Sequence, residues 1–366
     1  MGRLGVRREN FQSALNMSEM KYIIFRVDSS RSLGAGHLMR CLTLAEAMKK
    51  LGVRSHFVYQ TLPDHLGRLI KERGYSYTEI SGSHFDPERD AQLTLDSVNA
   101  VGAHWVIVDH YLIDARWESY IKGHVERVIV IDDLANRQHQ CDFLIDQNPI
   151  QCEKQYDKLL PANAVQLLGT EYALIRPEFL EMRPESLQRR ANSSLETLTI
   201  SMGGIDNQNI NLKVLEILQT THHATDLQIN LVLGFHSPWL GQIKNFLAQS
   251  SLHVELYSHV HDMASLLMRS DLALGAAGGS AWERCCLGVP SIIMAIAENQ
   301  KPGAIALRSS GAATYISSIS EIPAALSNFF KDESGHKLFK MSTAASQLID
   351  GHGARRITER LFHGIG

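Results

Sequence analysis

Short apolar runs alternate with amphipathic stretches along nearly the whole chain. The run "YIIFRVD" (Tyr22–Asp28) has the length of a buried strand, and the following stretch, His37–Gly52, carries apolar residues at helical spacing and stops at a glycine. This alternation is typical of a mostly parallel sheet built from βαβ units. The strands predicted in the first half are Tyr22–Asp28, Ser55–Gln60, Tyr77–Ser81, Trp105–Tyr111, Arg127–Asp133 and Asp142–Asn148.

The same alternation restarts after a polar segment, Met182–Ser194, which we interpret as a linker. The sequence therefore predicts an α/β fold of two doubly wound, Rossmann-like domains, 21–185 and 195–366, with a ligand cleft between them. Residues 1–20 show neither pattern and are expected to form a disordered extension. The strands predicted in the second half are Thr197–Gly204, Leu227–Gly234, His253–Ser258, Leu272–Gly279, Pro290–Ile296 and Ala313–Ser317.

Composition narrows the class of protein. The 366 residues suffice for two cores, and a net charge of −3 without a long basic block argues against nucleic acid as the main partner. No apolar run is long enough to cross a bilayer, so no membrane partner is expected. Five cysteines, an odd number without a CxxC motif, predict reduced thiols and a cytoplasmic location. Two of them, Cys285 and Cys286, are expected to pack within a helix.

The stretch "GAGHLMRC" places His37 directly behind two glycines, at the start of the first predicted helix. Glycine lets a ligand approach the backbone, and the free amides of a helix start favour an anion. His37 is therefore a candidate catalytic base, a phosphate contact or a helix cap, and Gly36 a candidate substrate contact. Arg40, one turn later, either reaches a phosphate or forms an internal salt bridge.

Carboxylates follow several of the predicted strands. Asp28 and Asp109 are candidates to orient the substrate or a water molecule. Of the adjacent pair Asp132 and Asp133, we expect one in a turn and the other exposed to solvent or substrate, because neighbouring strand residues point to opposite faces. No set of histidines and carboxylates has convincing metal-ligand spacing, so neither a metal nor a cofactor is predicted.

Two glycine-rich turns in the second half each join a strand to a helix. They contain Gly203 and Gly204 in "SMGG", and Gly279 in "GAAGGSAWERCC". Exposed amides at such turns suit a diphosphate, although neither turn matches a G-x-G-x-x-G or Walker pattern. Ser280 either adds a hydroxyl to this site or caps the helix. Glu283 lies where its carboxylate can accept hydrogen bonds from ribose hydroxyls.

A third loop, "AENQ" (Ala297–Gln300), follows the next predicted strand and points to the same edge of the sheet. It either binds a sugar or phosphate or only completes a turn. Asn299 and Gln300 are accordingly candidate substrate contacts.

Taken together, the motifs resemble a known family. In order, "DSSRSLGAGHLMRCLTLAEAM", "VDHY", "VIVIDDLANRQHQCDFLIDQNP", "GTEYALIRPEF", "SMGGIDNQN", "GAAGGSAWERCCLGVPSIIM" and "AENQ" are similar to the UDP-2,4-diacetamido-2,4,6-trideoxy-β-L-altropyranose hydrolases of pseudaminic acid biosynthesis. The resemblance covers the chain from about Lys21 onward. It implies a GT-B-like fold, similar to the lipid II N-acetylglucosaminyltransferase, with UDP on the C-terminal domain.

The resemblance also implies roles for single residues. His37 matches the general base, Tyr111 and Asn299 match positions near the sugar and diphosphate, and Glu283 matches the ribose-binding carboxylate. The implied reaction is attack of water at the anomeric carbon, with inversion, releasing UDP and 2,4-diacetamido-2,4,6-trideoxy-L-altrose. The expected protein is a monomer that needs no metal, and its product supplies glycosylation of flagellin or of a surface polysaccharide.

Two other functions remain open from the residues. A GT-B glycosyltransferase would pass a related sugar to an acceptor, and would need an acceptor groove. A noncatalytic nucleotide-sugar sensor would keep the glycine loops but has no need of a histidine at the cleft.

Overall fold

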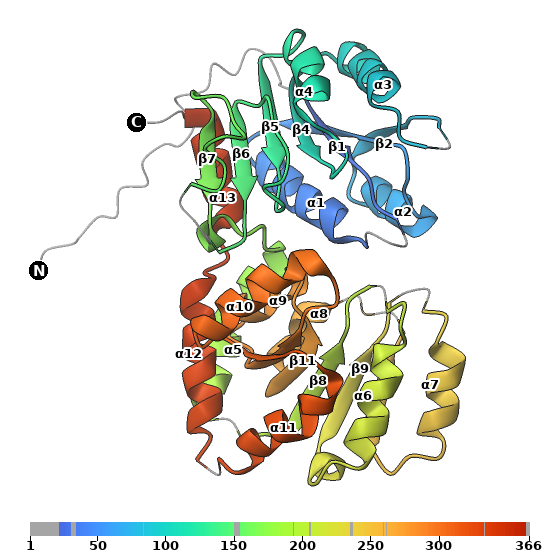
Figure 1. Ribbon diagram of the computed structural model, residues 1–366, viewed down its shortest axis with the longest axis vertical. Coiled ribbons are helices and arrows are strands. Elements are labelled where there is room, and N and C mark those ends of the chain that lie inside the picture. The colour runs from blue at the N-terminus through green and yellow to red at the C-terminus, as the bar shows by residue number, and fades with distance from the viewer. Residues whose placement is uncertain are drawn as a thin grey trace, which may run out of the picture.

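Two parallel sheets, one above the other in Figure 1, form the framework of the protein. The computed structural model describes residues 22–30, 34–82, 84–149, 154–192, 194–204, 206–234, 237–258, 260, 262–332 and 334–363. The N-terminal sheet has the order β3-β2-β1-β4-β5-β6-β7. Its strands are β1 (Tyr22–Val27), β2 (Arg54–Tyr59), β3 (Ser76–Glu79), β4 (Ala103–Asp109), β5 (Arg127–Ile131), β6 (Phe143–Asp146) and β7 (Val165–Leu168).

The C-terminal sheet has six strands in the order β10-β9-β8-β11-β12-β13. Both orders reverse direction next to the first strand, which is the arrangement of a doubly wound fold with a ligand crevice at the strands' carboxyl ends. The strands are β8 (Thr197–Ser201), β9 (Gln228–Val232), β10 (His253–Tyr257), β11 (Leu272–Ala276), β12 (Ser291–Met294) and β13 (Thr314–Ile316).

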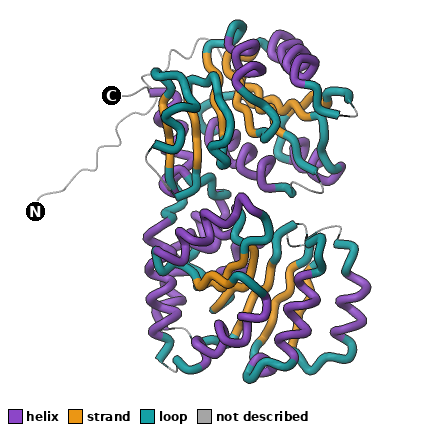
Figure 2. The backbone as a smooth tube through the Cα atoms, viewed as in Figure 1, coloured by secondary structure: helices purple, strands orange, loops and turns teal. Residues whose placement is uncertain are grey.

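Helices pack around both sheets, as the tube view shows (Figure 2). In the N-terminal half they are α1 (Gly36–Lys49), α2 (Asp64–Glu72), α3 (Pro87–Val101) and α4 (Ala115–Lys122), and the next helix, α5 (Pro177–Arg189), already packs against helices of the C-terminal half. In the C-terminal half they are α6 (Ile210–Gln219), α7 (Leu240–Leu247), α8 (Met263–Met268), α9 (Gly279–Cys286), α10 (Lys301–Ser309), α11 (Ile322–Phe330), α12 (His336–Leu348) and α13 (Gly353–His363).

Strand β1 shows why helices are needed on both faces of its sheet. Ile23 and Phe25 belong to a core cluster that includes Leu38 and Leu42 of α1, whereas Ile24 belongs to a second cluster with Leu95 of α3. Successive side chains of a strand point to opposite faces, so a strand that is apolar at every position requires cover on both.

The last helix returns to the first sheet. Ile357 and Leu361 of α13 are fully buried in the cluster around α1, and Phe362 stacks on Trp105 of β4 at 4.7 Å between ring centroids. Figure 1 shows α13, in red, beside β6 and β7. The chain thus crosses between the two halves twice, and the predicted domain boundaries stay predictions.

All twelve predicted strands are confirmed, but two expectations were wrong. Strand β7 was missed, because only Leu167 of its four residues is buried and the run lacks a clear apolar pattern. The segment Met182–Ser194 is not a loose linker: α5 covers it as far as Arg189. Its polarity reflects a helix with an exposed face, while Phe179 and Ser186 are fully buried.

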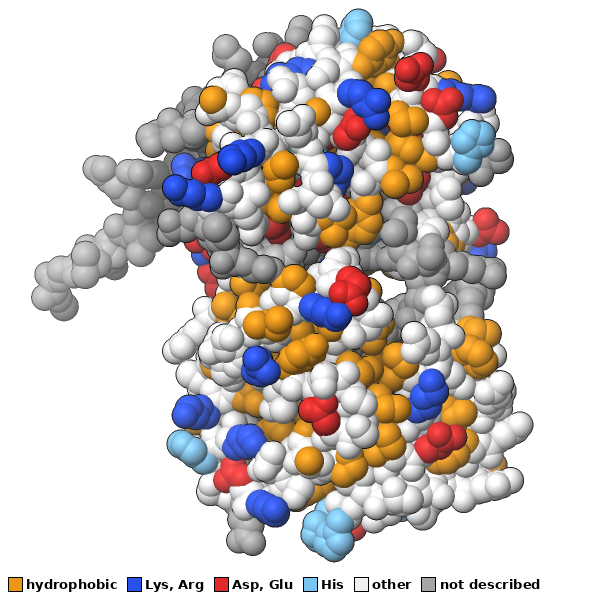
Figure 3. Space-filling view, in the orientation of Figure 1, with side chains coloured by type: hydrophobic (Ala, Val, Ile, Leu, Met, Phe, Trp, Pro, Cys, Tyr) orange, Lys and Arg blue, Asp and Glu red, His pale blue; other side chains and the backbone are white. Residues whose placement is uncertain are grey.

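The surface agrees with the modest net charge. Basic and acidic side chains are interspersed on the face shown in Figure 3. Among the described helices, none combines the length and the apolar character needed to span a membrane.

Candidate active site

His37 is the second residue of α1 and faces the end of β4. Its Nδ1 lies 2.5 Å from Oδ1 of Asp109, the last residue of that strand. The helix has no side-chain cap, so the cap interpretation of His37 is wrong. A Cβ added to the neighbouring Gly36 would meet no atom of the described residues within 4 Å, which leaves room for a ligand beside the histidine.

Arg40, one turn further along α1, forms the internal salt bridges that the sequence left open. Its Nε and Nη2 donate to the two Asp109 oxygens at 2.5 and 2.6 Å, and its Nη1 donates to Asp133 at 3.0 Å. Burial by itself would raise the pKa of Asp109, but Arg40 and then His37 hold it well below its usual range. Asp109 is therefore ionised at neutral pH.

The ionised Asp109 determines which nitrogen of His37 is basic. A carboxylate only accepts hydrogen bonds, so at 2.5 Å the Nδ1 of His37 must carry the proton. Arg40 Nη2, at 3.2 Å from the same nitrogen, is itself a donor and cannot replace this interaction. The other nitrogen, Nε2, then holds the lone pair and can accept a proton.

Tyr111 links this cluster to the C-terminal half. Its ring meets the His37 ring edge-on at 4.6 Å, and its hydroxyl donates to Asp133 at 3.4 Å. The same hydroxyl accepts a hydrogen bond from Nδ2 of Asn299 at 3.1 Å. Burial raises the pKa of Tyr111, so the phenol keeps its proton. Two predicted substrate contacts, Tyr111 and Asn299, are thus brought together from the two halves.

Two other predicted substrate contacts already have protein partners. Asp28 accepts hydrogen bonds from Arg26, from the amides of Gln60 and Thr61, and interacts with His110. Gln300 accepts the Ile296 amide hydrogen through Oε1, which closes the short 3-10 turn Glu298–Gln300. Their roles toward substrate stay predictions.

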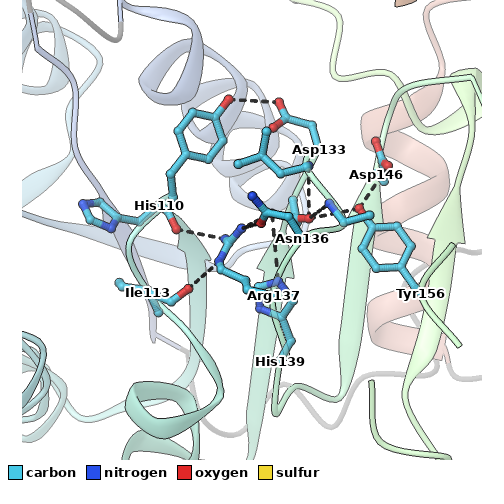
Figure 4. A network of polar contacts seen from close by, with 12 residues as sticks. His110, Ile113, Asp133, Asn136, Arg137, His139, Asp146 and Tyr156 are labelled. Carbon is cyan, nitrogen blue, oxygen red and sulfur yellow. Dashed lines mark hydrogen bonds and ion pairs between the residues drawn. The ribbon is translucent and has the colours of Figure 1, made fainter. Parts of the chain in front are cut away.

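Asp132 takes the turn role that was expected of one member of the pair, whereas exposure of Asp133 to a substrate stays a prediction. Asp132 accepts hydrogen bonds from the amides of Leu134 and Ala135, which confirms its turn role, and pairs with Arg137 at 2.7 Å. Asp133 points instead toward Tyr111 and Arg40. Figure 4 shows the polar contacts around these two aspartates. They include the Tyr156 hydroxyl, which lies 3.1 Å from a carboxylate oxygen of Asp132 and 3.1 Å from one of Asp146.

A cavity of about 270 Å³ opens in the C-terminal half. Four of the five predicted UDP contacts, Gly203, Gly204, Ser280 and Glu283, line it, and Gly279 begins the adjoining helix α9. Gly203 has φ +84°, a conformation that favours glycine, and a Cβ on Gly203, Gly204 or Gly279 would meet no atom of the described residues within 4 Å. The two glycine loops are therefore adjacent, with open space beside them.

Two side chains in this cavity have partners that the sequence did not predict. Glu283 accepts a hydrogen bond from Arg176 at 2.6 Å, and Arg176 also pairs with Glu178 at 3.0 Å. Ser280 makes no helix cap; its hydroxyl accepts a hydrogen bond from Arg284 at 3.2 Å. Arg176 lies in the "LIRPEF" motif, whose Arg-Pro pair at a helix start was the available signal.

Cys285 and Cys286 are buried free thiols of α9, as expected. Within the described ranges, no group of three histidine, cysteine, aspartate or glutamate side chains could hold a metal ion. Independence of a metal stays a prediction.

Solved structures identify the architecture. MurG from Acinetobacter baumannii superposes with a TM-score of 0.65 at 14% identity, covering 94% of this chain and 100% of that one. The fold is GT-B. UDP-GlcNAc 2-epimerase from Neisseria meningitidis, solved bound to UDP-GlcNAc, matches with a TM-score of 0.64 at 14% identity over the same shares. The GT-B-like fold expected from the sequence is confirmed.

Sequence comparisons agree for the C-terminal half of this GT-B protein. Residues 197–361 match the glycosyltransferase family 28 C-terminal domain. The UDP-2,4-diacetamido-2,4,6-trideoxy-β-L-altropyranose hydrolase of Campylobacter jejuni is 26% identical over 289 residues, which are 79% of this chain and 97% of that protein. The uncharacterized protein MJ1062 of Methanocaldococcus jannaschii is 24% identical over 73% of this chain, but the match spans only 54% of that protein.

Proposed function

We propose that this GT-B protein hydrolyses UDP-2,4-diacetamido-2,4,6-trideoxy-β-L-altropyranose, with inversion, to UDP and 2,4-diacetamido-2,4,6-trideoxy-L-altrose. The reaction would belong to cytoplasmic pseudaminic acid biosynthesis. The Campylobacter jejuni relative carries this activity in its name, and the epimerase with the same fold was solved with a UDP-sugar bound. The observation that carries the proposal is the pairing of His37 with Asp109 beside Tyr111.

In the proposed reaction His37 acts as the general base. Its Nε2 removes a proton from water as the water oxygen bonds to the anomeric carbon, on the face opposite UDP. Asp109 keeps Nδ1 protonated and stabilises the imidazolium that forms, which is the role of a carboxylate behind a catalytic histidine. The bond between the anomeric carbon and the β-phosphate oxygen breaks, and UDP leaves with the electron pair.

The leaving group needs little help from an acid. UDP is a stable anion, and amides at a helix start can meet the negative charge that grows on its β-phosphate. The cavity beside α9, with open space at Gly203, Gly204 and Gly279, supports binding of UDP there. Asn299 would lie near the diphosphate, and its hydrogen bond to Tyr111 would link that position to the His37 cluster.

A glycosyltransferase is the second candidate. The match to a glycosyltransferase family 28 domain and the likeness to MurG favour it. It differs from the hydrolase only in the nucleophile, because a sugar hydroxyl would replace water. A sensor would bind the same nucleotide without turnover.

One assay separates the three functions. The purified protein is incubated with a panel of UDP-sugars and no acceptor, UDP release is followed, and the sugar is identified by mass spectrometry. We expect catalytic release of UDP and free 2,4-diacetamido-2,4,6-trideoxy-L-altrose, with the inverted anomer in early NMR spectra. Release only on addition of an acceptor would indicate a transferase, and UDP-sugar binding without any release would indicate a sensor.

A further inference from the structure

Arg284 of α9 is a buried arginine with an incomplete set of partners. Only 2% of the residue is exposed. Its Nη2 donates to the carbonyl oxygen of Ala276 at 2.8 Å and its Nη1 to the Ser280 hydroxyl at 3.2 Å, while its Nε is buried and has no hydrogen-bond partner among the described residues. A guanidinium has five N–H donors, so several remain available.

No carboxylate of the described residues forms an ion pair with this guanidinium. Within the part of the chain that the structure describes, no ion pair involves Arg284, and the adjacent Glu283 is bound to Arg176. Burial lowers the pKa of Arg284 to about 10, so the side chain remains a cation at neutral pH. Buried arginines of the N-terminal half differ, because Arg26 and Arg40 each pair with two aspartates. An uncompensated buried charge is costly unless a ligand supplies its counter-ion.

Arg190 shows what a structural arginine looks like in the same half. It is 2% exposed and lacks a carboxylate hydrogen bond among the described residues, yet its guanidinium donates to four carbonyl oxygens. These carbonyls, of Leu267, Met268, Ser270 and Leu287, lie at or just beyond the C-terminal ends of α8 and α9, where helix dipoles are negative. Arg190 therefore needs no ligand.

Arg284 lines the cavity that also contains Ser280, Glu283 and the glycine loop of Gly203 and Gly204. Strand β11 leaves room for its guanidinium: a Cβ on Gly275 would lie 3.1 Å from Nη1. The start of α9 adds a second source of positive potential to the same cavity, because helix N-termini favour anions. Two positive features thus face one space.

We propose that Arg284 binds the diphosphate of the nucleotide, whose negative charge is the counter-ion of this buried guanidinium. The inference rests on the proposed function, which places a UDP-sugar in the cavity. Breaking the anomeric bond adds a negative charge to the β-phosphate, so the interaction strengthens as UDP forms. Arg284 is then a binding residue that also favours departure of the leaving group.

The test compares uridine, UMP and UDP by calorimetry on the full chain. In Arg284→Met, the affinity for UDP should fall roughly 10- to 100-fold, the usual effect of losing a charged hydrogen-bond partner. The affinity for uridine should change less than about twofold, and Arg284→Lys should recover part of the UDP affinity. The matched control, Arg190→Met, should lower the melting temperature while keeping the ratio of UDP to uridine affinity.

Several results would overturn the inference. Unchanged UDP affinity in Arg284→Met would do so, as would equal losses for uridine and UDP, which indicate a structural role. If the methionine variant does not fold, the ratio of UDP affinity to uridine affinity is measured in Arg284→Gln and Arg284→Lys instead. If the wild-type protein hydrolyses the UDP-sugar but the Arg284 variants keep their UDP affinity, the Arg284 inference is wrong and the proposed function stands. If the wild-type protein does not bind UDP, both the Arg284 inference and the proposed function are wrong.

Discussion

At the scale of single residues, the decisive feature is the Asp109 carboxylate beside His37, whose two oxygens both accept hydrogen bonds. Asp109 accepts hydrogen bonds from His37 and Arg40, and the Cys41 thiol lies 3.6 Å from its Oδ2. Asp109 itself is 1% exposed. Such a fully bonded carboxylate holds the imidazole in one orientation and one tautomer, which is what a general base requires.

Replacing His37 with glutamine tests its role as base. We expect turnover to fall roughly 10²- to 10⁴-fold, because the amide keeps a polar group but cannot accept the proton. UDP affinity should stay near the wild-type value, since the proposed diphosphate contacts lie in the other half. Steady-state kinetics and calorimetry measure the two effects, and the exposed His223→Gln variant is the control. A parallel loss of UDP binding would make His37 a phosphate contact.

Glu283 is tested through UDP binding. Glu283→Ala should weaken UDP by roughly 1–3 kcal/mol, because the ribose hydroxyls lose a charged acceptor. The matched control is Glu178→Ala, which removes the other carboxylate partner of Arg176 and leaves Glu283 in place. Calorimetry should therefore show a loss in the first variant and little change in the second. Equal losses in both would assign the effect to Arg176.

At the scale of elements, the carboxyl ends of four neighbouring strands in the N-terminal sheet each carry an aspartate. Asp28, Asp109, Asp132 and Asp146 end or directly follow β1, β4, β5 and β6, which are consecutive in the sheet. Three of them have an arginine partner, because Arg26, Arg40 and Arg137 pair with Asp28, Asp109 and Asp132. Asp146 has no arginine partner among the described residues, and burial raises its pKa to about 6.

This raised pKa predicts how Asp146 affects stability. The folded state holds the proton more tightly than the unfolded chain, so ionisation of Asp146 removes stability as the pH rises from about 4 through about 6. Asp146→Asn cannot ionise and should be more stable than the wild type by roughly 1–3 kcal/mol above pH 6. Below about pH 4 the difference should vanish.

Denaturant unfolding of both proteins between pH 4 and 8 measures this difference. The exposed Asp157→Asn variant is the control and should follow the wild type at every pH. A gap between Asp146→Asn and wild type that does not change with pH would contradict the assignment, since a lost hydrogen bond alone has no such profile. Tyr156, which contacts Asp146 and Asp132, should keep its place in both proteins.

At the scale of the whole molecule, one hydrogen-bonded path joins the two halves. It runs from Asn299 through Tyr111 and Asp133 to Arg40, and from there to Asp109 and His37. In the space-filling view the halves are separated by a hollow on one side (Figure 3). A change in the relative position of the halves would therefore be expected to alter the position of His37, the proposed base, through these hydrogen bonds.

A double-mutant cycle tests the bridge. Tyr111→Phe and Asn299→Ala should each lower kcat/KM several-fold, consistent with a loss of roughly 1 kcal/mol for one hydrogen bond. The double variant should be no worse than the poorer single variant, because both changes remove the same bond. Tyr120→Phe, a remote hydroxyl bound to Gln92, is the control. Additive losses would show that the two side chains act independently.

The sequence by itself determined the local features of this protein. Period-two and period-3.6 apolar patterns identified twelve strands, and strand-end aspartates and glycine turns were visible because they depend on neighbouring residues. It did not reveal β7, whose pattern is too short, or the helix in Met182–Ser194, whose buried side chains are few. These are the elements whose local signal is weakest.

Only the tertiary structure decided the partners. His37 and Asp109 are 72 positions apart, Tyr111 and Asn299 are 188 apart, and α13 packs on the sheet at the opposite end of the chain. The sequence also could not show that the Arg284 guanidinium is buried without a carboxylate partner among the described residues. Periodicity specifies which face of an element is buried, whereas contacts between distant side chains depend on how both sheets and their helices pack together.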